Sequence, residues 1–66
     1  MEDNWEIARV FNKLYLAEIG KQVLEDNGIE AVILNQKDSA INSIGDVYLY
    51  VHKDNLEKAK QLLAQV

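Results

Sequence analysis

The strict alternation of side chains between Val47 and His52 is the feature that most constrains what this chain can fold into. Val47, Leu49 and Val51 fall on one side of an extended chain, and Tyr48, Tyr50 and His52 fall on the other. Successive side chains of a β-strand point to opposite faces of a sheet, so this period of two predicts a strand. Its aliphatic face must be buried against other elements.

The hydrophobic period becomes helical between Lys13 and Asn27. Apolar or small residues recur three and four positions apart along one stripe, with charged and amide side chains opposite. The stripe consists of Leu16, Ala17, Ile19, Gly20, Val23 and Leu24. Glycine is unfavourable inside a helix by about 1 kcal/mol relative to alanine. Because Gly20 lies on the stripe, it indicates a close approach of this helix to the sheet.

Both ends of this helix carry sequence signals. The side-chain oxygen of Asn12 is expected to cap the first turn. At the other end Gly28 supplies the left-handed residue of a Schellman motif, and Ile29 is then expected to lie against Leu24.

Two further strands and a second helix complete the pattern. Trp5–Asn12 and Ile29–Asn35 are rich in residues that favour strands. The second helix is expected to open at Asp54, where Glu57 completes a capping box. Its buried stripe consists of Leu56, Ala59, Leu62, Leu63 and Val66.

This order of elements predicts an α+β fold in a single domain that spans residues 1–66. A right-handed crossover places the first helix on one face of the sheet, and the second helix shares that face to bury its own stripe. The arrangement is a split β-α-β, ferredoxin-like β-α-β-β-α fold with two helices on one face of a three-stranded sheet. We expect the third strand between the first and second, whereas a competing order pairs the first two directly. One core is expected from Ile19, Val23, Val47, Leu49, Val51, Leu62 and Leu63.

The sheet face opposite the helices is predicted to be uncovered. Alternation places Tyr48 and Tyr50 there, and one apolar set of the second strand, Val32 and Leu34, joins them. Trp5 is expected on the same face. Monomers seldom expose such a surface, and tyrosine and tryptophan favour interfaces. These five residues are the candidate partner interface, for a second copy or for another protein.

Chain length also favours self-association. A domain of 66 residues buries only about 60% of the surface that its unfolded chain exposes. The chain has no cysteine and one histidine, so disulfides and the usual zinc sites are not available to support so small a core. Self-association is the remaining means of support.

No group of residues predicts catalysis, a cofactor or a metal site. His52 has no second histidine, cysteine or carboxylate cluster beside it, so we interpret it as an exposed strand end. Glu25 and Asp26 are neighbours on a helix and point apart. Ser39 and Ser43 have no identifiable base. We therefore expect a protein that is not an enzyme.

The net charge of −4 argues against nucleic acid, which is bound through a cationic surface. The first residues are acidic, and no apolar run reaches the length of a membrane span. We expect a cytoplasmic protein with no membrane association.

Several segments together resemble a known family of short bacterial domains. They are the Trp5–Phe11 strand, Leu16–Ile19, Val23–Glu25, Asn27–Ala31, Val47–Val51, Asp54 and Lys58-Ala59, and they cover nearly the whole chain. The family is that of the putative prokaryotic signal-transducing proteins, a domain of unknown function. The resemblance implies a ferredoxin-like fold related to the nitrogen-regulatory PII proteins, and a role in signal transduction. It supplies no functional residues.

Two hypotheses about function follow. The first is a small regulatory or protein–protein interaction domain that self-associates through its open sheet face. The alternative is a small-ligand sensor that uses the 36–45 loop and the adjacent sheet surface, where Lys37, Ser39, Asn42 and Ser43 would donate hydrogen bonds to an anion.

Overall fold

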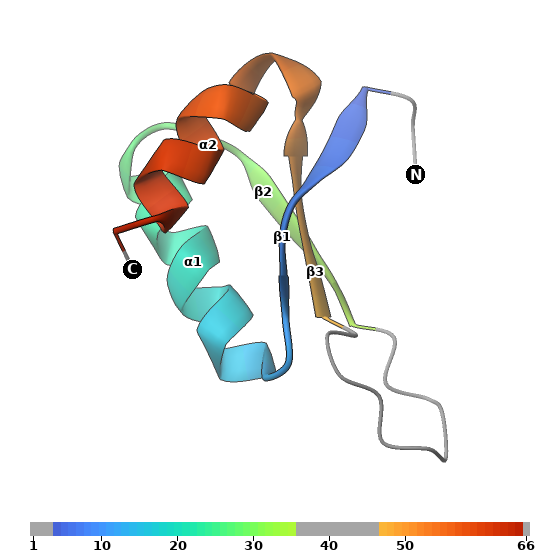
Figure 1. Cartoon of the computed structure of the whole chain (residues 1–66). Coiled ribbons are helices and arrows are strands. Elements are labelled where there is room, and N and C mark those ends of the chain that lie inside the picture. Colours follow the sequence, from blue (N-terminus) through green and yellow to red (C-terminus); the bar gives the residue numbers. More distant parts are fainter. Residues whose placement is uncertain (1–3, 36–46, 66) are drawn as a thin grey trace.

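Three strands and two α-helices form within residues 4–35 and 47–65, the part of the chain that the computed structural model describes (Figure 1). The elements in chain order are β1 (Trp5–Phe11), α1 (Leu14–Asp26), β2 (Ala31–Asn35), β3 (Val47–His52), a 3-10 turn η1 (Lys53–Asn55) and α2 (Leu56–Leu63). The predicted strands and helices are confirmed, with shifts of one or two residues at most of their ends.

The sheet has the order β1-β3-β2, and β3 pairs antiparallel with both neighbours. The predicted central position of the third strand is confirmed, and the order that pairs the first two strands directly is wrong. Figure 1 shows both helices on the same side of this sheet. The architecture is thus α+β and consistent with a ferredoxin-like fold, as predicted.

The core lies between the helices and the sheet. The largest fully buried side chains come from α1, β3 and α2, and they are Leu24, Val47, Leu49, Val51 and Leu63. Ala17 and Ala59 are fully buried on the inner faces of the helices. Burying a leucine or valine side chain contributes roughly 1.5–3 kcal/mol, so these few residues supply much of the stability of the domain.

Gly20 lies where α1 packs tightly against both the sheet and α2. A Cβ atom at this position would lie 3.1 Å from Leu63 Cδ2 and 3.3 Å from both Leu49 Cδ2 and Phe11 Cζ. Glycine therefore allows α1 to approach the sheet and α2 together, as predicted from its place on the apolar stripe.

The predicted Schellman motif ends α1. The Ile29 amide donates to the Leu24 carbonyl at 2.9 Å, and the Gly28 amide donates to the Glu25 carbonyl at 3.0 Å. Gly28 has a φ of 80°, which is strained for residues with a Cβ atom. Ile29 and Leu24 are both buried, as this motif predicts.

Two predicted helix caps are wrong. Lys13 rather than Asn12 occupies the N-cap of α1, and it makes no side-chain cap bond. Both residues are needed to turn the chain between the end of β1 and the helix. Asp54 does not cap α2, because η1 takes up the turn in which it lies and Asn55 becomes the N-cap.

The predicted core needs one correction. Ile19 is 47% exposed, because the face of α1 turned to the sheet is formed by Ala17, Gly20 and Leu24. Successive helical residues are about 100° apart, so Ile19 is turned away when Gly20 faces the core. Val23 and Leu62 are half-buried, and Leu62 packs against the buried core. Val66 lies outside the described residues.

Candidate interaction surface

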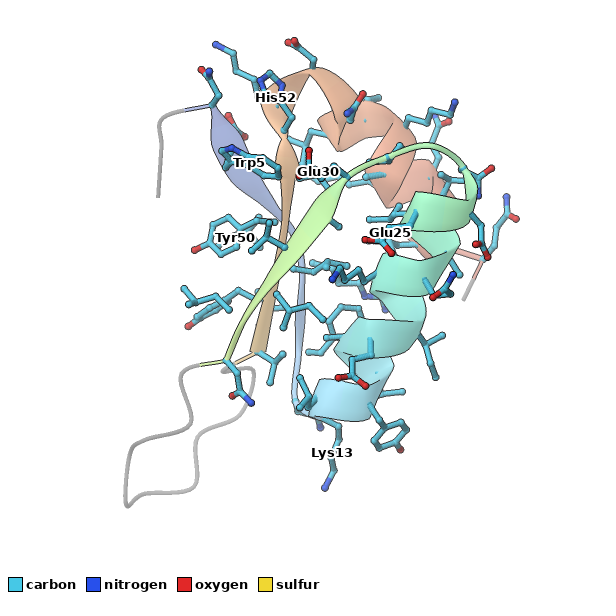
Figure 2. All side chains as sticks on the ribbon, turned by 180° about the vertical axis from the view of Figure 1, so that it is seen from behind. Trp5, Lys13, Glu25, Glu30, Tyr50 and His52 are labelled. Carbon is cyan, nitrogen blue, oxygen red and sulfur yellow. The ribbon has the colours of Figure 1, made fainter. Side chains whose placement is uncertain are left out.

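Eight side chains cover the sheet face opposite the helices, which we call the open face. They are Trp5, Ile7 and Val10 from β1, Tyr48, Tyr50 and His52 from β3, and Val32 and Leu34 from β2. Figure 2 shows Trp5 and Tyr50 projecting from the side of the sheet that faces away from α1.

The strand register arranges these side chains in rows across the sheet. Tyr50 lies between Ile7 and Val32, and Tyr48 lies in the same way between Val10 and Leu34. Directly opposed side chains on one face of a sheet contact each other, and pairs of aromatic with β-branched residues stabilise the strands. The rows therefore form one continuous layer of apolar side chains.

The aromatic rings of the open face contact each other edge to face. The Tyr48 and Tyr50 rings have centroids 6.5 Å apart and an interplanar angle of 72°. The Trp5 and His52 rings are related in the same way, at 6.1 Å and 73°. Such T-shaped pairs are a favoured geometry for aromatic rings, so the pairs hold the four side chains in fixed orientations.

The open face is apolar, exposed and uncharged. Ile7 is 41% exposed, Val10 43%, and Val32 and Leu34 36% each. The four aromatic side chains are half-buried. No aspartate, glutamate, lysine or arginine belongs to the set, although these residues make up 27% of the chain.

A β-bulge in β1 determines which of its residues reach the open face. The register to β3 shifts between Ile7 and Arg9, so Ala8 is an extra residue opposite the partner strand. Before the bulge Trp5 and Ile7 share the open face, and after it Val10 does. On the helix side, Arg9 donates through Nη1 to the Leu63 carbonyl at 3.1 Å.

The structure brings together all five residues of the predicted partner interface, Trp5, Val32, Leu34, Tyr48 and Tyr50. Sequence reasoning missed two further members of the open face, Ile7 and Val10. Simple alternation from Trp5 would have found Ile7. Val10 has no comparable signal, because only the bulge moves it to this face.

His52 closes the open face at the end of β3 and also begins the following turn. Its Nδ1 accepts a hydrogen bond from the Asp54 amide at 3.2 Å, and the Asp54 carboxylate lies 3.4 Å from the same atom. A neutral imidazole that accepts at Nδ1 carries its proton on Nε2. The histidine predicted to be an exposed strand end thus has a structural role as the cap of η1.

The two neighbouring carboxylates considered from sequence, Glu25 and Asp26, lie apart from the open face. Glu25 pairs with Lys21 at 3.8 Å, and Asp26 accepts a hydrogen bond from Gln22 at 2.9 Å, all on the exposed surface of α1. Among residues 4–35 and 47–65, no three histidine, cysteine, aspartate or glutamate side chains cluster in a way that could hold a metal ion. The 36–45 loop, with Lys37, Ser39, Asn42 and Ser43 as candidate residues, lies outside the described residues.

Neither helix in the described part of the chain combines the length and the hydrophobicity that crossing a bilayer requires.

Comparison with known proteins gives one match. A family model described as "Putative prokaryotic signal transducing protein" (DUF2007) matches residues 5–66, which include every described strand and helix. No curated protein and no solved structure matches the chain. The description of the family names signal transduction, so it suggests a signalling role.

Proposed function

Because the chain belongs to the family of the prokaryotic signal-transducing proteins described above, we propose that it is a non-catalytic regulatory domain that binds protein through its open face. The partner that fits this face best is a second copy of the chain. The observation that carries the proposal is the uncharged open face, in which four aliphatic side chains are each at least 36% exposed.

The chemistry of the open face favours a protein partner. Its centre consists of two tyrosines with aliphatic residues on both sides. Tyrosine combines a large apolar ring with a hydroxyl group, and it is enriched in protein interfaces together with tryptophan. Exposed apolar patches of this kind mark surfaces for other proteins or for membranes.

The charge distribution favours a second copy. The chain has a net charge of −4, so two copies repel each other unless their charges stay apart. Within residues 4–35 and 47–65 the open face carries no such charge, because the charged residues described there lie on the helices, on the connections and on the helix side of β1. Two open faces can therefore meet without burying a charge, which would cost several kcal/mol.

The test replaces both central tyrosines by glutamate. Two carboxylates in a dry contact are strongly unfavourable, whereas the same groups are tolerated in water. We expect sedimentation at tens of micromolar, roughly the range in which weak contacts form, to show an oligomer for the parent protein and an assembly of half that mass or less for Tyr48→Glu/Tyr50→Glu.

A matched control separates the position of the charges from their number. Tyr15→Glu/Gln61→Glu makes the same change in net charge at exposed sites of α1 and α2. It should keep the parent mass. Circular dichroism must show that both variants remain folded. A parent protein that sediments as a monomer, or a Tyr48/Tyr50 variant that keeps the parent mass, would contradict the proposal.

A further inference from the structure

The two edges of the sheet differ in how well they could accept another strand. β2 pairs with β3 over five consecutive residues without a register shift, and its sequence from Ala31 to Asn35 contains no charge. β1 contains the bulge at Ala8 and the charged residues Glu6 and Arg9. Bulges and charged residues are the means by which proteins prevent pairing at an edge. The β1 edge is thus protected in two ways, whereas the described residues of β2 carry neither a bulge nor a charge.

We infer that the free edge of β2 pairs antiparallel with β2 of a second copy, so that two sheets join into one of six strands. The pairing is symmetric about Ile33, which lies opposite its own copy, and it places Val32 opposite Leu34. Opposed residues of an antiparallel pair point to the same face. Both open faces therefore become one surface, with the helices of both copies on the other side.

The charges next to β2 allow this arrangement. Glu30 precedes the strand, so in an antiparallel pair the two copies of Glu30 lie at opposite ends, about 20 Å apart at 3.4 Å per residue. Figure 2 shows Glu25 on the side of α1 near β2, and Lys21 lies 3.8 Å from it. Lys21 offsets the charge of Glu25, so this ion pair adds no net charge that would repel its copy.

The helices also leave room for strand pairing. α1 packs against both β2 and β3, so its axis lies inward of the β2 edge. Across the new pair, two copies of α1 would be separated by about two strand spacings, roughly 10 Å, which is a normal distance between packed helices.

Strand pairing would enlarge the open face as well as extend the sheet. Three strands with a spacing of about 4.8 Å and a length of about 20 Å cover a projected area of roughly 300 Å². Six strands cover roughly twice this area, closer to the 800 Å² or so of surface that each partner contributes to a standard interface. The edge contact can form without the open-face contact, and each contact would strengthen the other.

Amide hydrogen exchange on the parent protein tests the inference directly. The amides of an edge strand that point away from β3 exchange quickly when the edge is free. We expect these amides to exchange at least about tenfold more slowly in β2 than in β1, with protection that rises with protein concentration. Equally fast exchange at both edges would overturn the inference.

Proline substitution gives a second, independent test. Proline is tolerated at an edge where the replaced amide faces solvent, and it removes the donor that a new strand needs. Adjacent amides alternate in direction, so one of Val32→Pro and Ile33→Pro leaves the pairing with β3 intact. The folded variant should sediment with half the parent mass. The β1 amides in the exchange measurement serve as the control, because a proline at Ile7 would also alter the open face.

The two proposals fail in different ways. If both contacts form, the parent protein is a tetramer. The Tyr48→Glu/Tyr50→Glu variant is then a dimer joined at the β2 edges, and its β2 amides exchange slowly. The folded β2 proline variant is a dimer joined by its open faces. Edge pairing is contradicted if the β2 amides of the tyrosine variant exchange quickly, or if the β2 proline variant keeps the parent mass. Neither result contradicts the open-face contact. If neither β2 proline variant folds, the exchange measurement on the parent protein still shows whether the β2 edges pair.

Discussion

Gly20→Ala tests how tightly α1 packs against the sheet. Two effects of opposite sign act on the free energy of unfolding. Alanine is favoured over glycine inside a helix by about 1 kcal/mol. Its Cβ atom would, however, lie 3.1–3.3 Å from atoms of Leu63, Leu49 and Phe11, and overpacking of this kind costs roughly 1–3 kcal/mol. Leu49 and Leu63 are fully buried and cannot move without displacing other core side chains. We expect a net loss of about 1 kcal/mol.

The contribution of the closest contact can be isolated by a double-mutant cycle with Leu63→Ala. Leu63 is buried in the core, so its truncation alone should cost roughly 2–5 kcal/mol. The truncation also removes the Cδ2 atom that lies 3.1 Å from the new methyl group. In this background Gly20→Ala should be neutral or stabilising, which gives a favourable coupling energy of about 1–2 kcal/mol.

Urea unfolding followed by circular dichroism measures these energies, at one protein concentration because association would shift the midpoint. If Gly20→Ala alone stabilised the protein by about 1 kcal/mol, only helix propensity would be acting and the close approach would be irrelevant. If the cycle were additive within about 0.5 kcal/mol, Leu63 would not be the side chain that resists the added methyl group.

Two further substitutions, Gly28→Ala and Arg9→Met, test how single local features contribute to the free energy of unfolding. Gly28→Ala should lower the free energy of unfolding by roughly 1–2 kcal/mol, because φ is 80° at this position. The new Cβ atom meets nothing within 4 Å, so this loss should add to that of Leu63→Ala. Arg9→Met keeps the aliphatic stem but loses the hydrogen bond to the Leu63 carbonyl and the contact with the Phe11 ring, so a loss of about 1–2 kcal/mol is expected. Lys13→Met, at an exposed site, should change stability by less than about 0.5 kcal/mol in the same unfolding assay.

The features that the sequence predicts correctly are those determined by neighbouring residues. The alternation of side chains in β3 and the Schellman motif that ends α1 each require only a few consecutive residues, and both are confirmed. The place of Tyr48 and Tyr50 on the open face follows from the same alternation. The helix caps failed for the opposite reason. Whether Asn12 or Lys13 occupies the N-cap depends on how many residues the turn after β1 requires, which tertiary packing decides.

The composition of the open face could be predicted only in part, because it depends on a register shift. A bulge inserts one residue, and every side chain after it changes face. Nothing in the sequence of β1 distinguishes Ala8 as that residue. The rotation of α1 is likewise a tertiary effect. Small residues at positions 17 and 20 let the helix approach the sheet along one line, and Ile19 is left exposed beside it.

Val32 and Leu34 belong both to the open face and to the edge strand β2, so the two proposed contacts are linked. A strand pair that fixes β2 also fixes the side chains that the open face presents. Binding at one contact then favours binding at the other, and by thermodynamic reciprocity the coupling acts equally in both directions. A different protein that bound the open face would displace the second copy there and would change the assembly. A surface that exchanges its own copy for a partner in this way converts binding into a change of assembly, which is a simple way for a small domain to transmit a signal.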